Sequence, residues 1–301
     1  MQNQIISIIT ASYNCGKYIH RLLDSVLMQT YPAIEMFVVD DGSIDDTQSI
    51  IERYIPLFEN KGYSLSYHYQ ENQGQSVAVN NALKMIKGEY LVWPDADDFY
   101  KTKDALEILA SPLKNSLDDV GMSRCFLEYL NEDDLRVVRT IKSDHPFSES
   151  LFEDCLFGTQ GFWYCSGGYM VKTGVLRETI PDLEIYTEHD AGQNWQLMLP
   201  VLYEHKCITV PSVNYSVLMR NSSHSRGQYS TRTQVNKQLN GYRNTILSTL
   251  ERIPSMPREQ LRSYSNRINR KYNRLVLENN IRQYSRPFRQ LIKKLLNRKH
   301  D

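Results

Sequence analysis

The stretch that decides the fold is residues 34–43, which read IEMFVVDDGS. A mostly apolar run rich in β-branched side chains ends abruptly in two aspartates, a glycine and a serine. This pattern is typical of a buried strand that runs into a polar loop. It recurs on either side, in residues 5–14, which read IISIITASYN, and in residues 90–98, which read YLVWPDADD. We therefore expect a sheet whose buried strands end in short polar segments.

Segments with helical spacing of apolar residues separate these strands. The expected strands are residues 5–10, 34–39, 65–69 and 90–93, and the expected helices are residues 18–28, 47–58 and 77–86. Strands and helices that alternate in this way form right-handed βαβ units, so the sequence predicts an α/β fold with a mostly parallel sheet. Ligands of such open sheets bind beyond the carboxyl ends of the strands. Residues 11–14, 40–43 and 94–98 should therefore meet on one rim.

The rest of the chain is less regular up to about residue 215. A helix is expected at residues 104–109, and β-rich segments at 120–129 and 135–141. From Tyr229 onward the sequence is helical in pattern, polar and basic.

The composition is that of an ordinary globular protein. Of 301 residues, 41% are hydrophobic and 23% charged, which excludes a disordered chain. No apolar run approaches the ~18 residues of a membrane span, and the N-terminus does not have the pattern of a signal peptide. The five cysteines form no C-x-x-C pair, so we expect reduced thiols in a cytoplasmic protein.

The net charge of zero conceals two segments of opposite sign. Residues 1–218 carry 16 basic and 31 acidic side chains, a net charge of −15. Residues 219–301 carry 19 basic and 4 acidic side chains, a net charge of +15. Such asymmetry between parts of a chain is itself a functional signal.

Three carboxylates lie within four residues in Asp95-Ala96-Asp97-Asp98. They repel one another unless a cation lies among them, and Mg²⁺ or Mn²⁺ prefers oxygen ligands together with a substrate phosphate. The alternative is a solvated turn that caps a helix, where aspartate is also favoured. The position at the end of a buried strand favours the metal. The chain has neither a G-x-G-x-x-G nor a P-loop motif, which argues against dinucleotide dehydrogenases and P-loop NTPases.

Five segments in this order resemble family 2 glycosyltransferases with a GT-A fold. They are Ser7–Asn14, Val38–Asp45, Asn72–Asn80, Lys87–Tyr90 and Asp95–Asp98. The resemblance implies a Rossmann-like nucleotide-sugar-binding domain, which the helical pattern beyond Tyr229 extends by a C-terminal helical segment. The resemblance has a limited range along the chain. It is strong up to about residue 100, weaker to about 225 and absent beyond.

The resemblance also implies roles for individual residues. Tyr13 is expected to stack near the base of a UDP-sugar, Asp41 to accept a hydrogen bond from that base, and Asp95 and Asp97 to form the D-x-D motif, with Asp97 the direct metal ligand. Core packing is the alternative for Tyr13. The nucleotide-sugar contacts implied are Ala11, Tyr13, Asn14, Asp41, Asp95, Ala96, Arg220 and His224. Gly74 and Asn80 are expected to shape the site rather than to contact the ligand.

At the general base the sequence departs from the pattern of the family. Inverting members of the family place a Glu-Asp pair at the start of a helix, where this chain has Gln193-Asn194. Asn194 cannot take a proton from an acceptor hydroxyl. Asp190, and after it Glu188, are the expected catalytic carboxylates, and solvated helix-capping acids are the alternative.

Two further segments have both a functional and a structural interpretation. Residues 219–226 resemble the loop that closes over the donor diphosphate, where Arg220 and Arg226 could pair with phosphate and His224 with phosphate or metal. A polar surface loop is the alternative. Trp195 with residues 161–164 could form an aromatic floor for a sugar, or belong to the core.

The segment 281–300 contains seven Lys and Arg and no acid. Its apolar residues recur at helical spacing, which fits a helix lying on an anionic membrane surface. Packing on the chain's own acidic part or on a second copy, and nucleic-acid binding, are the alternatives. We expect a GT-A domain over residues 1–225 and a basic helical extension over 226–301.

These observations predict a metal-dependent, inverting glycosyltransferase. It would use a UDP-sugar and Mn²⁺ or Mg²⁺, and act on a glycan or lipid-linked acceptor at the inner face of the cell membrane. The rival is a non-catalytic sugar-nucleotide-binding or assembly subunit. A nucleotidyltransferase is disfavoured, because this chain lacks, after its first strand, the glycine-rich basic loop that the reaction needs.

Overall fold

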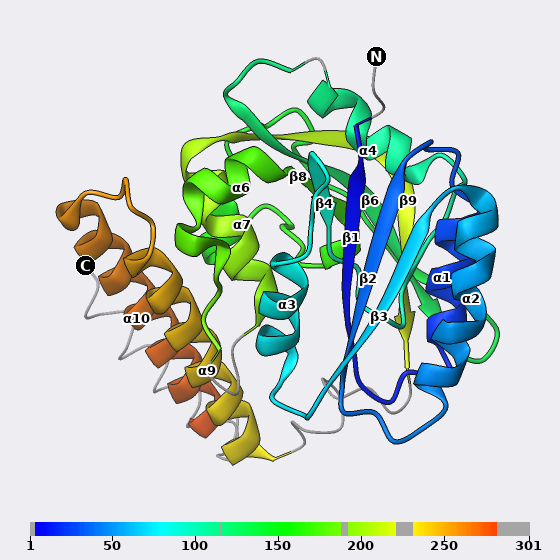
Figure 1. The fold of residues 1–301 in the computed structure, drawn as a ribbon. Coiled ribbons are helices and arrows are strands. Elements are labelled where there is room, and N and C mark those ends of the chain that lie inside the picture. Colours follow the sequence, from blue (N-terminus) through cyan, green and yellow to red (C-terminus); the bar gives the residue numbers. More distant parts are fainter. Residues whose placement is uncertain (1–3, 115, 188–191, 221–230, 282–301) are drawn as a thin grey trace.

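The computed structural model describes residues 4–114, 116–187, 192–220 and 231–281 (Figure 1). The strands are β1 (Ile6–Ser12), β2 (Ile34–Asp41), β3 (Ser64–Gln70), β4 (Tyr90–Val92), β5 (Phe99–Tyr100), β6 (Val120–Asn131), β7 (Val137–Ile141), β8 (Tyr169–Lys172) and β9 (Lys206–Met219). The α-helices are α1 (Ile19–Leu27), α2 (Thr47–Lys61), α3 (Gln75–Leu83), α4 (Ala105–Lys114), α5 (Phe152–Phe157), α6 (Thr173–Thr179), α7 (Gln193–Glu204), α9 (Arg232–Glu251) and α10 (Arg258–Ile281).

The strands form one sheet in the order β3-β2-β1-β4-β8-β6-β9-β5, with β7 paired to β6. The expected parallel pairing is present from β1 to β4. The later half is mixed, because β8 runs antiparallel to both β4 and β6 while β6 and β9 are parallel. The sheet as a whole is therefore mixed, and the parallel prediction applies to its N-terminal half.

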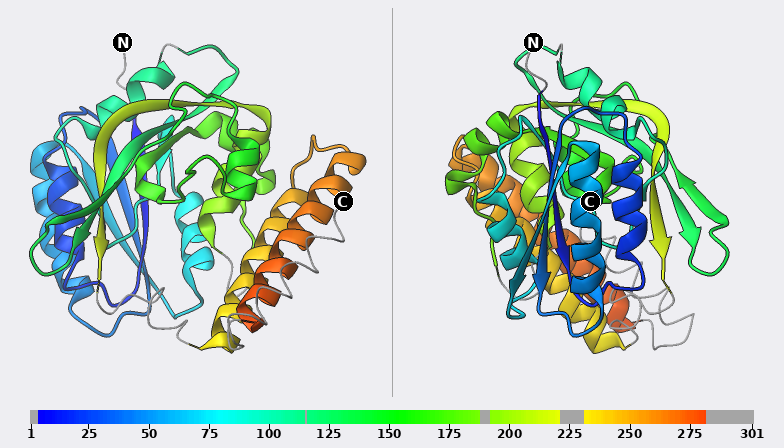
Figure 2. Two further views of the ribbon diagram at one scale, coloured as in Figure 1. Left: turned by 180° about the vertical axis from the view of Figure 1, so that it is seen from behind. Right: turned by 45° about the vertical axis from the view of Figure 1, so that its right-hand side comes forward.

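The order of the strands explains which helices cover each face of the sheet. The steps from β1 to β2 and from β2 to β3 move in one direction across the sheet, and the step from β3 to β4 returns. Right-handed crossovers then place α1 and α2 on one face and α3 on the other, as Figures 1 and 2 show. The α1 helix buries Ile19, Leu22, Leu23 and Val26, the stripe that its sequence spacing predicts.

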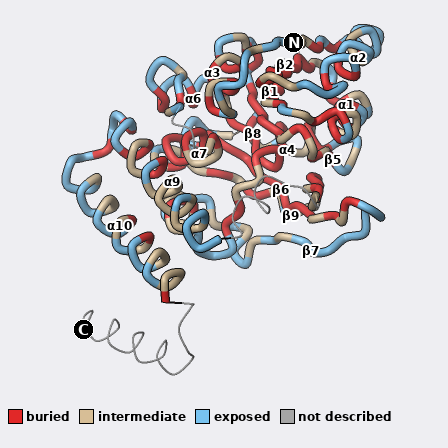
Figure 3. The backbone as a smooth tube through the Cα atoms, turned by 90° about the horizontal axis from the view of Figure 1, so that it is seen from below, coloured by how far each residue is buried: buried red, intermediate tan, exposed pale blue. Residues whose placement is uncertain are grey.

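Two long helices follow the sheet. Figures 1 and 2 show α9 and α10 side by side beyond α7, on the side of the molecule away from α1 and α2. Most of their residues are exposed or only partly buried (Figure 3), but Ile246, Leu250, Ile268 and Tyr272 belong to the same buried cluster as the sheet. None of the helices in these ranges is long and apolar enough to cross a membrane.

Candidate functional site

Three strand ends meet on one rim, as the sequence predicts. Ser12 at the end of β1 lies beside Asp40 at the end of β2 in the parallel register. The turn after β4 joins them, because the Thr10 hydroxyl donates to the Pro94 carbonyl at 3.1 Å. The rim is therefore a direct consequence of parallel pairing among the first four strands.

Asn14 connects the loops that follow β1 and β2. Its backbone N–H donates to Ser43 Oγ at 2.7 Å, and its Oδ1 accepts from the Ile44 N–H at 3.0 Å. Asn14 has a φ of 49°, a left-handed conformation that asparagine tolerates. Its side-chain oxygen thus positions the loop, a role that the sequence did not predict.

The Tyr13 side chain lies at the rim and is 41% exposed. Core packing, the alternative to a base platform, is therefore excluded for this tyrosine. Ala11 is half-buried at the end of the same strand, and Ala96 is buried within the turn after β4.

Asp41 is buried and ties the end of β2 to the start of α3. One carboxylate oxygen accepts from Gln70 Nε2 at 2.7 Å and from the Gln73 N–H at 2.8 Å, and the other accepts from the Gly74 N–H at 2.9 Å. A carboxylate offers about four acceptor positions, so room for one further donor is left. Asp41 thus shapes the loop, and the hydrogen bonds among the described residues do not use all of its acceptor positions.

The turn Asp95–Asp98 is not a solvated turn. Asp98 is 3% exposed, and its carboxylate accepts from the Leu218 N–H at 2.9 Å and from the Tyr215 hydroxyl at 3.3 Å. Asp95 accepts from Gln75 Nε2 at 3.4 Å and from Gln193 Nε2 at 3.3 Å. Asp98 thus anchors the turn to β9, and the other two carboxylates remain at the rim.

Burial and mutual repulsion disturb these carboxylates. Desolvation, together with the charge of Asp97, raises the pKa of Asp95 to about 7. Desolvation also raises the pKa of Asp97, against the opposing effect of the Arg220 guanidinium, and the pKa of Asp98 is raised by the same two causes as that of Asp95. A cation beside such buried, mutually repelling carboxylates would stabilise their charged form.

Arg220 supplies a cation at the rim. Its Nε lies 2.6 Å from Asp97 Oδ2, and its guanidinium lies over the ring of Tyr18 at 5.0 Å. The sequence predicted Arg220 as a phosphate contact, and the structure places it beside the predicted metal ligand. His224 and Arg226, predicted for the same loop, lie outside the described residues.

The donor set at Asp95 and Asp97 fits Mg²⁺ or Mn²⁺. Magnesium commonly takes one or two carboxylates and completes its shell with water and substrate phosphates. In the residues that the structure describes, no three His, Cys, Asp or Glu side chains are arranged to hold a metal. The remaining ligands would therefore have to come from solvent and substrate.

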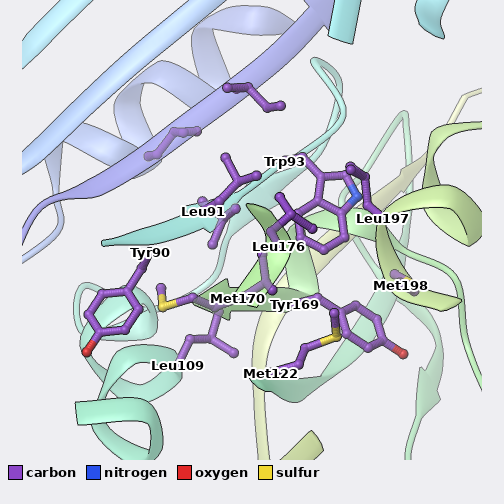
Figure 4. Packing of buried hydrophobic residues seen from close by; sticks show 14 of the residues in the cluster. Tyr90, Leu91, Trp93, Leu109, Met122, Tyr169, Met170, Leu176, Leu197 and Met198 are labelled. Atoms are coloured by element: carbon purple, nitrogen blue, oxygen red, sulfur yellow. The ribbon is translucent and has the colours of Figure 1, made fainter. Parts of the chain in front are cut away.

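Asn194 has a structural role at the expected position of the base. Its Oδ1 accepts from Trp93 Nε1 at 3.0 Å, and its Nδ2 donates to the Tyr164 carbonyl at 2.6 Å. Trp93 in turn lies beside Leu197 of α7 in the core (Figure 4). The predicted catalytic acids Glu188 and Asp190 lie outside the described residues.

The segment that leads to residues 188–191 is held on two sides. Asn80 of α3 makes two hydrogen bonds of 2.9 Å with the backbone of Ile185, one to the carbonyl and one from the N–H. Gln196 of α7 likewise bonds both the N–H and the carbonyl of Tyr186. Asn80 is therefore structural, as expected. Gln196 was not predicted, because a glutamine inside a helix carries no signal of this role.

The aromatic segment packs in the core rather than flooring a sugar site. Phe162 and Trp163 are buried, and the Arg124 guanidinium lies 4.1 Å from the centre of the Trp163 ring. Trp195 packs against Tyr164 and Tyr242, with ring centres 4.9 and 5.0 Å apart. The interpretation of these rings as a sugar platform is not supported.

A cavity of about 470 Å³ lies apart from the rim residues. It is lined by residues 179–182 and 184–187, by Gln196 and Pro200 of α7, and by Thr249 and Arg252 at the end of α9. None of the predicted metal or nucleotide ligands lines it.

A sequence model of the family described as Glycosyl transferase family 2 matches residues 7–167. An uncharacterized glycosyltransferase of Rickettsia typhi is 34% identical over 157 residues, which are 51% of this chain and 45% of the relative. The Escherichia coli enzyme named UDP-Glc:alpha-D-GlcNAc-diphosphoundecaprenol beta-1,3-glucosyltransferase WfaP is 32% identical over 60% of this chain and 66% of its own. The chain thus spans less than half the length of the first relatives it matches.

Solved structures share the fold. Staphylococcus aureus TarS 1–349 in complex with UDP-GlcNAc superposes with a TM-score of 0.66 at 20% identity, covering 94% of this chain and 74% of that one. The mannosyltransferase PcManGT of Pyrobaculum calidifontis, in complex with GDP-Man and Mn²⁺, superposes with a TM-score of 0.57 at 20% identity over 97% and 79% of the two chains. The architecture is the GT-A fold, as expected.

Proposed function

This chain belongs to glycosyl transferase family 2, and we propose that it transfers a sugar from a UDP-sugar to a hydroxyl of a glycan or lipid-linked acceptor in surface polysaccharide biosynthesis. The observation that carries the proposal is the rim itself. An exposed tyrosine, an aspartate with one acceptor position left and two carboxylates, one of them in an ion pair with a guanidinium, lie at the carboxyl ends of adjoining strands. The names of the relatives and the UDP-GlcNAc held by TarS support the donor class.

The rim residues have distinct parts in the proposed reaction. Tyr13 would stack on the base, and Asp41 would accept a hydrogen bond from it while holding the loop before α3. Asp97 and Asp95 would hold the divalent ion, which when bound neutralises the charge that develops on the departing diphosphate. Arg220 would add a charge-assisted contact to that diphosphate. The Mn²⁺ in the PcManGT complex supports the metal.

The acceptor hydroxyl requires a base for inversion by direct displacement. Asn194 is already bonded to Trp93 and Tyr164 and has no carboxylate to accept a proton. We therefore propose Asp190, and after it Glu188, because they follow directly on the anchored segment 184–187.

We also propose how the chain is divided and where it acts. Residues 1–225 would form the catalytic GT-A domain, and residues 226–301 an extension that contains α9 and α10. The excess of basic side chains beyond residue 218 supports contact with an anionic membrane surface, where a lipid-linked acceptor resides. The protein would then lie on the inner face of the cell membrane, as a monomer or homo-oligomer without nucleic acid.

A non-catalytic sugar-nucleotide-binding or assembly subunit is the second candidate. The observation that favours it is Gln193-Asn194 at the start of α7, where a Glu-Asp pair is expected. It predicts donor binding without turnover. It also predicts retained function when Glu188→Gln and Asp190→Asn are combined.

The test is UDP release from a panel of UDP-sugars with Mn²⁺ and candidate acceptors. We expect Asp97→Ala to lower turnover by at least about a hundredfold, because the diphosphate loses the ion that neutralises it. Asp134→Asn, an exposed acid outside the site, is the matched control and should leave turnover unchanged. Full turnover by Asp97→Ala would disprove the assignment of Asp97 as a metal ligand. If the wild type neither binds a UDP-sugar nor releases UDP, the proposed enzymatic function is wrong.

A further inference from the structure

The contact between Arg220 and Asp97 has a geometry that suits exchange. The Nε atom lies 2.6 Å from Asp97 Oδ2, but it is not aligned for a hydrogen bond to any partner in the described chain. Charge, rather than a directed bond, holds the pair together. The two side chains are only 17% and 18% exposed, so solvent screens the attraction weakly.

The fold brings Arg220 to this position through its neighbours. Leu218 at the end of β9 donates its N–H to Asp98, and Tyr215 donates its hydroxyl to the same carboxylate. The strand end is thus tied to the Asp95–Asp98 turn, and Arg220 follows two residues later. The ring of Tyr18 lies under the guanidinium, and the Tyr18 hydroxyl is fixed by Glu132 at 2.7 Å.

This arginine balances part of the negative charge at the rim. Arg220 opposes the rise in the pKa of both Asp95 and Asp97, and it forms the ion pair of the Asp95–Asp98 turn within the described residues. A divalent ion on Asp97 would approach the same carboxylate as the guanidinium. Two cations that compete for one carboxylate repel each other, so each weakens the binding of the other.

We propose that Arg220 is the counter-ion of Asp97 in the nucleotide-free protein, and that it exchanges Asp97 for the donor diphosphate when the metal and nucleotide bind together. The proposal rests on the proposed function and adds to it a coupling between the two ligands. Metal alone must displace Arg220 into solvent. Metal with a nucleoside diphosphate gives the displaced guanidinium a new anionic partner. The nucleotide and the ion should therefore bind cooperatively.

The experiment measures binding of Mn²⁺ to the full chain by the loss of its free-ion electron paramagnetic resonance signal, with and without UDP. We expect Arg220→Gln to bind Mn²⁺ about tenfold more tightly than the wild type in the absence of nucleotide, because the competing charge is gone. We expect the same variant to bind UDP with Mn²⁺ about tenfold more weakly, because a charge-assisted contact to phosphate is lost. The opposite directions of the two changes are the signature of exchange.

Two variants keep the result interpretable. Arg220→Lys retains the charge, so its nucleotide-free Mn²⁺ affinity should stay near that of the wild type even if Arg220→Gln folds poorly. Arg267→Gln removes the arginine of α10 that pairs with Glu153 of α5, far along the chain from the rim residues, and should change neither affinity. Asp97→Asn should abolish Mn²⁺ binding in both conditions, which shows that the signal reports this site.

The outcomes distinguish a failure of the proposed exchange from a failure of the proposed function on which it rests. A wild type that binds neither UDP with Mn²⁺ nor a UDP-sugar overturns the proposed function, and the exchange with it. A wild type that binds UDP with Mn²⁺, while Arg220→Gln leaves the nucleotide-free Mn²⁺ affinity unchanged or lowers it, overturns the exchange alone. Equal Mn²⁺ affinities for Arg220→Lys and Arg220→Gln would also overturn it.

Discussion

Asn194 makes two hydrogen bonds that an aspartate could not make together. Its oxygen accepts from the Trp93 indole, and its nitrogen donates to the Tyr164 carbonyl. A carboxylate at this position could serve the indole but would face the carbonyl oxygen with a second acceptor. The amide is therefore fitted to its surroundings, and an acid at the start of α7 would be accommodated at a cost.

Replacing that amide tests the structural role directly. We expect Asn194→Asp to lower the free energy of unfolding by about 1–3 kcal/mol at pH 7, because the Tyr164 carbonyl loses its donor and meets a negative charge. Urea denaturation measures the loss. Asn266→Asp, on the exposed side of α10, is the matched control and should change stability by less than about 0.5 kcal/mol. A variant as stable as the wild type would show that the amide is dispensable there.

At the scale of elements, the first hundred residues were predictable because their signals are local. Each strand is a short apolar run, and Gly88 in the turn before β4 has a physical reason: a Cβ there would lie 2.5 Å from the Ile5 carbonyl oxygen. The same reasoning predicted the convergence of Asp41 and Asp95. It missed the anchoring of Asp98 to Leu218, because that bond joins residues 120 positions apart.

The antiparallel strands and the docking of α10 were not predictable for the same reason. β8 is four residues long and pairs with strands far away in the sequence. Its residue pattern therefore does not show whether it runs parallel or antiparallel to them. Helix α10 is polar, and one of its contacts with the domain is made by Tyr264, whose ring lies 5.3 Å from that of Phe152 on α5. Such contacts follow from tertiary packing rather than from helix propensity.

The attachment of α10 to α5 has a pH dependence with a definite sign. Glu153 accepts from both terminal nitrogens of Arg267, at 3.1 and 2.9 Å, and this pairing lowers the pKa of Glu153 despite some opposing desolvation. A group whose pKa is lower in the folded state stabilises the fold above its unfolded pKa of about 4.3. The contribution is lost as the pH falls through the folded pKa.

We therefore expect Glu153→Gln to destabilise the protein at pH 7 and to have little effect at pH 3. The Glu153 side chain is 53% exposed, so screening limits the difference at pH 7 to less than about 1 kcal/mol. Urea midpoints at the two pH values measure it, and Glu59→Gln on the exposed surface of α2 is the control. An equal deficit at pH 7 and pH 3 would contradict the assigned cause, because a protonated Glu153 no longer attracts Arg267.

At the scale of the whole molecule, helices α9 and α10 of the basic segment lie beside the acidic part of the chain (Figure 1). The acidic part contains the rim, where Arg220 already balances part of the charge of the Asp95–Asp98 turn. The basic part begins beside that rim and continues through α9 and α10, whose buried residues join the core of the acidic part. Residues 231–281 thus pack against the chain's own domain, whereas the alternatives predicted for segment 281–300 concern residues outside the described ranges and stay predictions. This packing leaves the seven basic residues of segment 281–300 to be explained.

Truncation after Ile281 separates the remaining alternatives, because α10 ends at that residue and every described helix is kept. We expect the truncated protein to bind vesicles of phosphatidylglycerol at least about a hundredfold more weakly than the full chain, since each basic side chain near anionic headgroups contributes about 1 kcal/mol. Co-sedimentation measures binding, and vesicles of phosphatidylcholine are the control.

Salt and stability distinguish the causes of a change in that assay. Binding by charge must fall at 1 M salt, where the screening length is about 3 Å. Turnover with a water-soluble acceptor should survive truncation, because the rim residues Asp41, Asp95 and Asp97 lie in the retained part. A truncated protein that binds vesicles as the full chain does would place the membrane contact elsewhere. A truncated protein with a lower unfolding midpoint, and no vesicle binding by either form, would instead show that segment 281–300 packs on the protein itself.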